Sequence, residues 1–232
     1  MKNILIVGAS SSIGNTIIKK FHSATTNIVA TYNSKNCIES GENIYPMFLD
    51  LTDDKSIKNF VVRLVKVFQH IDIGIFLPSI VLGKSLDEYG SNDIDIVMSV
   101  NFSGQAKILT QIQSKFIDGS QIIYFSSISA QKGSYDPIYA ASKGAILSFV
   151  KSLASELPKG VRINAIAPGL IENSSMYNIM GKERQDFHRK QVPSNKLLQI
   201  EDLANVIYDL TKEHWSHLNG ACIDLNGGRY VR

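Results

Sequence analysis

Short apolar runs alternate with segments of helical periodicity along the whole chain. The apolar runs predict strands at residues 3–7, 27–31, 45–49, 71–77, 120–125, 161–166 and 221–225. Apolar residues three or four apart predict helices around residues 13–21, 56–68, 93–116, 139–157 and 201–211. Strands buried on both faces and alternating with helices are typical of a parallel sheet with helices on each side. We therefore expect an α/β fold built on a doubly wound, mostly parallel seven-stranded sheet.

The segment from residue 170 to 197 interrupts this alternation. It is polar, and Met176, Met180 and Pro193 are scattered through it. Such a segment is either a flexible lid over a binding site or an ordinary surface insertion. No linker divides the rest of the chain, so we expect one domain over residues 1–232 with a substrate lid at 170–197.

The composition restricts the class of protein. The chain has 232 residues, a net charge of +3 and 19% charged residues, and its basic residues are scattered, which predicts no nucleic-acid partner. Cys37 and Cys222 lie far apart and the five histidines show no ligand spacing, so we expect reduced thiols and no metal. The apolar run at residues 3–7 is too short for a signal peptide or a membrane span. We therefore expect a cytoplasmic protein without membrane attachment.

A turn rich in glycine and serine follows the first predicted strand, and a helix opens within it. The free N–H groups and positive dipole at a helix N-terminus bind phosphate. Glycine lets the backbone approach a ligand closely. The position of the turn predicts a dinucleotide site formed by Gly8, Ser10, Ser11, Ser12, Ile13 and Gly14.

The residues after the second predicted strand bear on the choice of dinucleotide. NAD sites usually place an acid there for the ribose 2′-hydroxyl. Here the segment is Tyr32-Asn33-Ser34-Lys35, and the next acid is Glu39. The Ser34 hydroxyl and the Lys35 ammonium suit a 2′-phosphate, although a solvated Lys35 is the alternative. We expect these four residues to bind the cofactor, with NADP(H) favoured over NAD(H).

A candidate catalytic pair, Tyr139 and Lys143, stands four residues apart in a predicted helix, so both side chains share one face. A free tyrosine has a pKa of about 10, and a nearby ammonium lowers it. The pair alone also occurs by chance on helix surfaces. However, the predicted strand at 120–125 leads into Ser126 and Ser127, where doubly wound sheets bind ligands. A serine there can hydrogen-bond a substrate oxygen.

These motifs together resemble the short-chain dehydrogenase/reductase family, most closely its 3-oxoacyl-acyl-carrier-protein reductase-like members. The turn from Gly8 to Gly14 resembles the family's TGxxxGxG, and Asn101 the asparagine of its Asn-Ser-Tyr-Lys tetrad. The segment from Asn164 to Gly169 resembles NxxxPG beside the nicotinamide, and residues 226–228 resemble the C-terminal DGG. The resemblance covers essentially the whole chain.

The resemblance implies a single-domain Rossmann fold and a role for each matched residue. The implied catalytic residues are Asn101, Ser127, Tyr139 and Lys143, with Ser126 as the alternative serine. Besides the two segments above, the implied cofactor-binding residues are Asp50, Leu51, Pro78, Ser79, Tyr139, Lys143, Pro168, Gly169 and Ile171.

The implied mechanism is general acid catalysis beside a positioned cofactor. Hydride passes from the pro-S face of the nicotinamide to a carbonyl carbon, and Tyr139 protonates the oxygen that Ser127 orients. Lys143 lowers the pKa of Tyr139 and binds the ribose hydroxyls. Asn101 holds a water that links Lys143 to solvent.

Several positions depart from the family pattern. Val7 replaces the usual threonine, and Ser12 replaces the middle glycine of the turn. Phe76-Leu77-Pro78-Ser79 replaces NNAG, which ordinarily supports the sheet beside the cofactor ribose. Proline has no N–H to donate there, so a shifted or weaker cofactor is one consequence. Asn173 stands where a cofactor-contacting threonine is common.

The expected function is NADP(H)-dependent oxidoreduction of a small-molecule carbonyl/alcohol pair, either a 3-oxoacyl thioester, free or on a carrier protein, or a sugar-related ketone. The lid offers apolar residues for an apolar group and basic ones for an anion: Met176, Tyr177, Met180 and Phe187, and Lys182, Arg184, Arg189 and Lys190. The alternative is a non-catalytic NADP-binding sensor or scaffold. A sugar-nucleotide epimerase or dehydratase is disfavoured, because those chains generally carry a larger C-terminal domain. The resemblance also implies a homotetramer or homodimer.

Overall fold

The computed structural model describes residues 1–232, and its seven strands form one sheet in the order β3-β2-β1-β4-β5-β6-β7. Every neighbouring pair is parallel. The strands are β1 (Lys2–Val7), β2 (Thr26–Tyr32), β3 (Ile44–Phe48), β4 (Ile71–Phe76), β5 (Phe116–Phe125), β6 (Arg162–Pro168) and β7 (Cys222–Leu225). The predicted doubly wound seven-stranded sheet is confirmed. Its order reverses between β1 and β4, the switch point where such sheets bind ligands.

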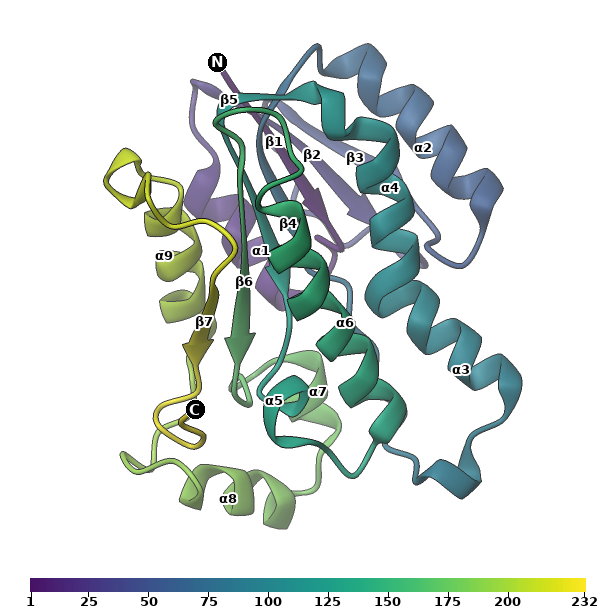
Figure 1. Ribbon diagram of the computed structural model, residues 1–232, viewed down its shortest axis with the longest axis vertical. Coiled ribbons are helices and arrows are strands. Elements are labelled where there is room, and N and C mark those ends of the chain that lie inside the picture. Colours follow the sequence, from purple (N-terminus) through teal and green to yellow (C-terminus); the bar gives the residue numbers. More distant parts are fainter.

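Helices cover both faces of the sheet (Figure 1). One face carries α2 (Asp54–Val67), α4 (Gly104–Ile112) and α6 (Pro137–Leu153), and the other carries α1 (Ser12–Phe21) and α9 (Ile200–Leu210). In β1, Leu5 and Val7 pack into the first core and Ile4 and Ile6 into the second. Successive strand residues point to opposite faces, so a strand covered on both sides is apolar throughout.

The predicted helix at residues 93–116 is divided in the structure. α3 (Ser91–Met98) continues through a π-helical turn, η2 (Ser99–Ser103), into α4, and a 3-10 turn, η3 (Gln113–Lys115), follows. Phe116 already belongs to β5, so the expectation of a helix up to Phe116 is wrong. Periodicity hid the boundary, because Ile112 and Phe116 keep helical spacing while both are buried.

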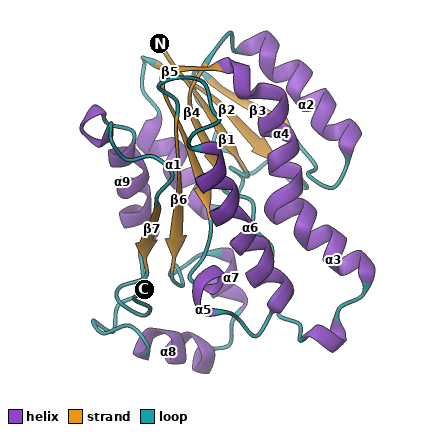
Figure 2. Ribbon diagram, in the orientation of Figure 1, coloured by secondary structure: helices purple, strands orange, loops and turns teal.

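The shorter helices gather beyond the carboxyl ends of the strands. The arrowheads of β6 and β7 point toward α5 (Ser129–Lys132), α7 (Ser175–Ile179), α8 (Lys182–Lys190) and the C-terminus (Figure 2). Residues 170–197 thus contain two helices, and a single bridge joins Ile171 to Leu198 at their base. Two further 3-10 turns are η1 (Leu86–Glu88) and η4 (Glu213–Trp215). None of the helices combines the length and apolarity that crossing a membrane requires.

Candidate active site

A cavity of about 930 Å³ opens at the carboxyl edge of the sheet. Its wall runs from Asp50, after β3, to Arg229, after β7. Most of the predicted site residues lie on this wall. Those that do not are Gly14, Ser34, Lys35 and Asn101.

The turn after β1 has the close approaches that the sequence predicts. Gly8 has a φ of +79°, and a Cβ there would lie 2.9 Å from Cγ of Pro78. A Cβ on Gly14 would lie 2.3 Å from the carbonyl oxygen of Ala9. Both positions therefore require glycine, the first for its backbone conformation as well as for space. Gly14 shapes the turn from behind the wall.

The start of α1 presents donors to the cavity. The N-cap residue Ser11 accepts a hydrogen bond from the Gly14 N–H at 3.1 Å. The N–H groups of Ser12 and Ile13 have no acceptor within the chain, and both residues line the cavity. Free donors at the positive end of a helix suit a phosphate group. The Ser12 hydroxyl donates to the carbonyl of Asn173 at 3.4 Å, which joins this turn to the base of the lid segment.

Of the four residues from Tyr32 to Lys35, two line the cavity and two are exposed to solvent. Tyr32 and Asn33 line the cavity, whereas Ser34 and Lys35 are exposed just beyond it. Glu39, the nearest acid after β2, forms an ion pair with Lys19 at 2.8 Å. Among the lining residues of the whole cavity, Asp50 is the only acid.

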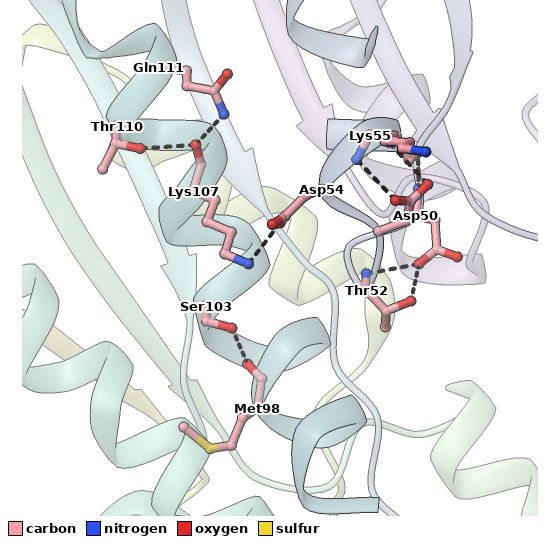
Figure 3. A network of polar contacts seen from close by, with 11 residues as sticks. Asp50, Thr52, Asp54, Lys55, Met98, Ser103, Lys107, Thr110 and Gln111 are labelled. Atoms are coloured by element: carbon pink, nitrogen blue, oxygen red, sulfur yellow. Dashed lines mark hydrogen bonds and ion pairs between the residues drawn. The ribbon is translucent and has the colours of Figure 1, made fainter. Parts of the chain in front are cut away.

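The carboxylate of Asp50 is oriented by the next turn. Its Oδ1 accepts from the N–H and the hydroxyl of Thr52 at 2.8 and 2.7 Å (Figure 3). In the same view, Lys107 of α4 pairs with Asp54 at the start of α2 at 2.8 Å. Asp50 is therefore fixed at the β3 end of the cavity with Oδ2 unused.

Tyr139 and Lys143 both face the cavity from the first turns of α6. The sequence marks the start of this helix strongly, because Asp136 is the N-cap and Pro137 follows it. Asp136 accepts from the Tyr139 N–H at 2.9 Å and from the Tyr89 hydroxyl at 2.7 Å. Its other oxygen accepts from the Gly83 N–H at 2.9 Å. This buried carboxylate ties the loop after β4 to the start of α6.

Burial raises the pKa of the Tyr139 phenol, and hydrogen bonding by the hydroxyls of Ser127 and Ser79 opposes it. The negative charge of Asp136 adds to the increase. Tyr139 therefore keeps its proton at neutral pH and has two hydroxyl groups beside it.

The two serines after β5 have different partners. The Ser126 hydroxyl donates to the carbonyl of Lys143 at 2.9 Å, so it holds α6 against the strand. The Ser127 hydroxyl accepts from the Ser129 N–H at 3.1 Å and is the one beside Tyr139. Both serines line the cavity, and Ser127 is the one whose hydroxyl hydrogen-bonds the Tyr139 hydroxyl.

Lys143 is almost wholly buried, and its Nζ donates to the carbonyl of Phe125 at 2.8 Å. Burial lowers the pKa of Lys143 to about 7. Lys143 is not among the groups that shift the pKa of Tyr139, so the expectation that it lowers this pKa is not borne out. A lysine with a pKa near 7 is only partly charged at neutral pH, which weakens its pull on the phenol.

Asn101 lies behind the wall in the π-helical turn η2 and is completely buried. Its side chain pairs with the backbone of Ile80, accepting at 2.7 Å and donating at 2.9 Å, and donates to the Ser142 hydroxyl at 2.9 Å. π-Helical turns are frequent at functional sites. Here the wide turn directs the amide of Asn101 at the loop after β4.

The segment Phe76-Leu77-Pro78-Ser79, which replaces NNAG, is held by an aromatic stack and by a side-chain amide. Phe76 stacks on Tyr124 of β5, with ring centroids 4.5 Å apart and an angle of 3°. The Tyr124 hydroxyl is buried without a partner. Gln105 of α4 donates to the carbonyl of Pro78 at 3.0 Å. Aromatic stacking and one amide thus hold the loop that carries Pro78 and Ser79 at the cavity.

Comparison with known proteins decides the family. A family model described as "Enoyl-(Acyl carrier protein) reductase" matches residues 8–229. A solved short-chain dehydrogenase/reductase from Brucella melitensis, described as a glucose/ribitol dehydrogenase, has a TM-score of 0.92. It is 27% identical, and the match covers 100% of this chain and 97% of that one. The chain belongs to the short-chain dehydrogenase/reductase family.

Two further matches illustrate its place among short-chain dehydrogenases/reductases. The 3-oxoacyl-acyl-carrier-protein reductase of Aquifex aeolicus is 27% identical over 97% of this chain and 96% of that protein. A short-chain dehydrogenase from Burkholderia cenocepacia, solved in complex with NADP, has a TM-score of 0.88. It is 23% identical over 99% of this chain and 98% of that one, a level that shows the fold.

The family assignment makes this chain an NAD(P)-dependent oxidoreductase that acts on C=O or CH–OH groups. The resemblance inferred from the sequence is confirmed, and the alternative of a non-catalytic sensor or scaffold is not favoured.

Sequence reasoning missed several polar residues around the short-chain dehydrogenase/reductase site. Asp136 was detectable, because an aspartate followed by proline at the start of a helical pattern is an N-cap signal. Ser142 and Gln105 gave no such signal, since their partners Asn101 and Pro78 are far away in sequence. The placement of the Ser79 hydroxyl beside Tyr139 also depends on tertiary structure alone.

Proposed function

We propose that this enzyme binds NADP(H) and reduces a small-molecule carbonyl compound to an alcohol. One observation carries the proposal: the hydroxyls of Tyr139 and Ser127 meet at the cavity, with buried Lys143 one turn along the same helix. A binding protein has no need of a buried, desolvated lysine one helical turn from a phenol that keeps its proton.

The turn after β1 fits a dinucleotide, because the N–H groups of Ser12 and Ile13 have no acceptor in the chain and Gly8 and Gly14 allow the tight turn that presents them to the cavity. We assign the pyrophosphate to residues 10–13, the adenine to Asp50 and Leu51, and the nicotinamide side to Pro168, Gly169 and Ile171. The absence of an acid on the wall after β2 supports NADP(H), with Ser34 and Lys35 next to the 2′-phosphate. When bound, the dinucleotide supplies the hydride.

The residues of the chain handle the proton and the oxygen. Ser127 donates a hydrogen bond to the substrate oxygen and orients it. Tyr139 delivers its proton to that oxygen as negative charge develops there, the role of a general acid. Lys143 binds ribose hydroxyls and, in its ammonium form, stabilises the tyrosinate that remains. Asn101 positions the loop after β4, and we assign to it the water of a proton path to Lys143.

For the substrate we retain two candidates, a 3-oxoacyl thioester and a sugar-related ketone. The name of the Aquifex aeolicus relative supports the first, and that of the Brucella melitensis structure supports the second. We assign residues 170–197 as the substrate lid of a single domain, because Met176, Met180 and Phe187 line the cavity from this segment. A homotetramer or homodimer remains our expectation for the assembly.

Titration with NADPH and with NADH, followed by nicotinamide fluorescence, tests the cofactor assignment. We expect NADPH to bind about tenfold more tightly or better, because a charge-assisted contact to the 2′-phosphate contributes about 1.5 to 3 kcal/mol. Lys35→Ala should remove this advantage and leave NADH affinity unchanged, while the exposed Lys66→Ala on α2 changes neither. Equal affinities would refute the NADP(H) preference. Binding of neither dinucleotide would refute the proposed function.

A further inference from the structure

Four basic side chains converge on the cavity at the end opposite Asp50. Lys132 ends α5, Arg184 and His188 lie on α8, and Arg229 follows β7. All four line the cavity. They come from three segments that the fold brings together beyond the carboxyl ends of β6 and β7, where Figure 1 shows α5, α8 and the C-terminus gathered.

No acid in the chain neutralises these charges. None of the seven ion pairs includes Lys132, Arg184 or Arg229. Two carboxylates of nearby segments are already engaged. Glu172 accepts from Arg189 and Gln199, both at 2.6 Å, and Asp224 accepts from Arg232 at 2.9 Å and Gln131 at 2.8 Å.

The contact between Arg229 and His188 leaves hydrogen-bond donors of both side chains unused. Arg229 Nη1 lies 2.6 Å from His188 Nδ1. A guanidinium can only donate, so Nδ1 accepts and the ring is neutral with its proton on Nε2. Burial, followed by the charges of Arg229, Arg184 and Lys132, lowers the pKa of His188 to about 4. Neither the His188 Nε2–H nor the remaining N–H groups of Arg229 have an acceptor in the chain.

A half-buried guanidinium without a counter-ion is unfavourable. The dinucleotide phosphates do not supply one under our assignment, because they belong at residues 10–13, after the central strand β1. The charges of Lys132, Arg184 and Arg229 therefore require a second anion for their neutralisation. The exposed rings of Phe187 and Tyr135 also line this cavity and offer contacts for an apolar portion of the molecule that carries the anion.

We propose that Arg229, Arg184, Lys132 and His188 Nε2 form a subsite for an anionic group, a phosphate or a carboxylate, on the substrate. This inference rests on the proposed function and narrows its substrate class to anionic carbonyl compounds. Arg189, which the sequence offered as a candidate, is excluded because it is paired with Glu172.

Two thioesters with the same reacting group test the proposal in steady-state assays. Acetoacetyl-CoA carries phosphates, and acetoacetyl-N-acetylcysteamine is neutral. We expect Arg229→Met to lower kcat/KM for the CoA ester about 10- to 100-fold through KM, since a charge-assisted hydrogen bond is lost. Turnover of the neutral ester should stay within twofold. The control Lys66→Met removes an exposed charge on α2, away from the cavity, and should change neither.

An equal loss for both esters would mean that Arg229 is only structural, and no loss for the CoA ester would mean that there is no subsite. A changed oligomeric state with unchanged ester selectivity would mean that Arg229 faces a second copy of the chain. Each of these three results overturns the proposal.

Binding of inorganic phosphate or succinate separates this proposal from the proposed function, because it needs no turnover. Histidine ring resonances report it locally. Either anion should raise the pKa of His188 from about 4 toward its ordinary value, since a nearby negative charge favours the protonated ring. The increase should be absent in Arg229→Met. Failure of both anions to move His188 overturns the subsite whether or not the protein reduces carbonyl compounds.

Discussion

Replacing Tyr139 with phenylalanine should lower the rate of carbonyl reduction about 10²- to 10⁴-fold, the range that a lost general acid costs. The phenol is buried beside Ser127 and Ser79 and keeps its proton at neutral pH. The substitution removes one oxygen atom and leaves the packing of α6 in place, so affinity for NADPH should stay within threefold. The decrease in NADPH absorbance with a 3-oxoacyl thioester measures the rate, and fluorescence titration measures the affinity.

Tyr135→Phe is the matched control. Tyr135 lines the same cavity but is 65% exposed. We expect its rate to stay within threefold of the wild type. If Tyr139→Phe retained more than a tenth of the wild-type rate, or if Tyr135→Phe were equally impaired, Tyr139 would not be the proton donor.

Lys143→Met should stabilise the protein while it lowers activity. Lowering the lysine pKa from 10.5 to about 7 corresponds to about 5 kcal/mol of preference for the neutral side chain. The hydrogen bond to the Phe125 carbonyl is lost, which costs about 1 kcal/mol. We therefore expect a net gain of about 2 to 4 kcal/mol at pH 7, or roughly 5 to 15 °C in Tm for a chain of this size.

The pH dependence identifies the cause of that gain. Between about pH 7 and 10.5 the unfolded chain holds a proton on Lys143 that the folded chain has lost, so wild-type stability rises with pH in this window. The advantage of Lys143→Met should be largest below pH 7 and absent above pH 10.5. Lys151→Met, exposed on the same helix, should show no such dependence. A destabilised Lys143→Met at pH 7 would contradict the burial argument.

The loss of activity in Lys143→Met has its own expected size. We expect kcat/KM for reduction to fall at least 100-fold, because the ammonium both binds ribose hydroxyls and stabilises the tyrosinate. In the wild type, kcat/KM should decline as pH rises through about 7, where the free enzyme loses the ammonium. A profile that is flat from pH 6 to pH 9 would mean that the charge on Lys143 is not needed.

Much of the fold could be predicted because hydrophobic periodicity is a local property. All seven strands follow from apolar runs, and the central ones pack on both faces, as Leu5 and Ile6 of β1 show. The π-helical turn at Ser99–Ser103 could not be predicted, since the apolar spacing of α3 and α4 continues through it. The start of β5 at Phe116 was hidden for the same reason.

The candidate site could likewise be predicted only in part. Motifs of fixed spacing predicted the turn after β1 and the Tyr139–Lys143 pair, because one turn or one helix places those residues. The contacts between distant segments could not be read from spacing. Examples are Ser126 on the Lys143 carbonyl and the pairing of Arg229 with His188. The low pKa of Lys143 is also a product of burial, which no motif reveals.

Transfer of a deuterium label tests hydride transfer, the central claim, most directly. The protein is incubated with NADPH deuterated at the pro-S position of C4 and with acetoacetyl-CoA, and the product is examined by mass spectrometry and NMR. The account predicts a 3-hydroxyacyl product with one deuterium on the carbinol carbon, formed by the wild type and suppressed in Tyr139→Phe. A hydroxyacyl product without deuterium at that carbon would contradict it. So would the absence of product from protein that binds both NADPH and acetoacetyl-CoA.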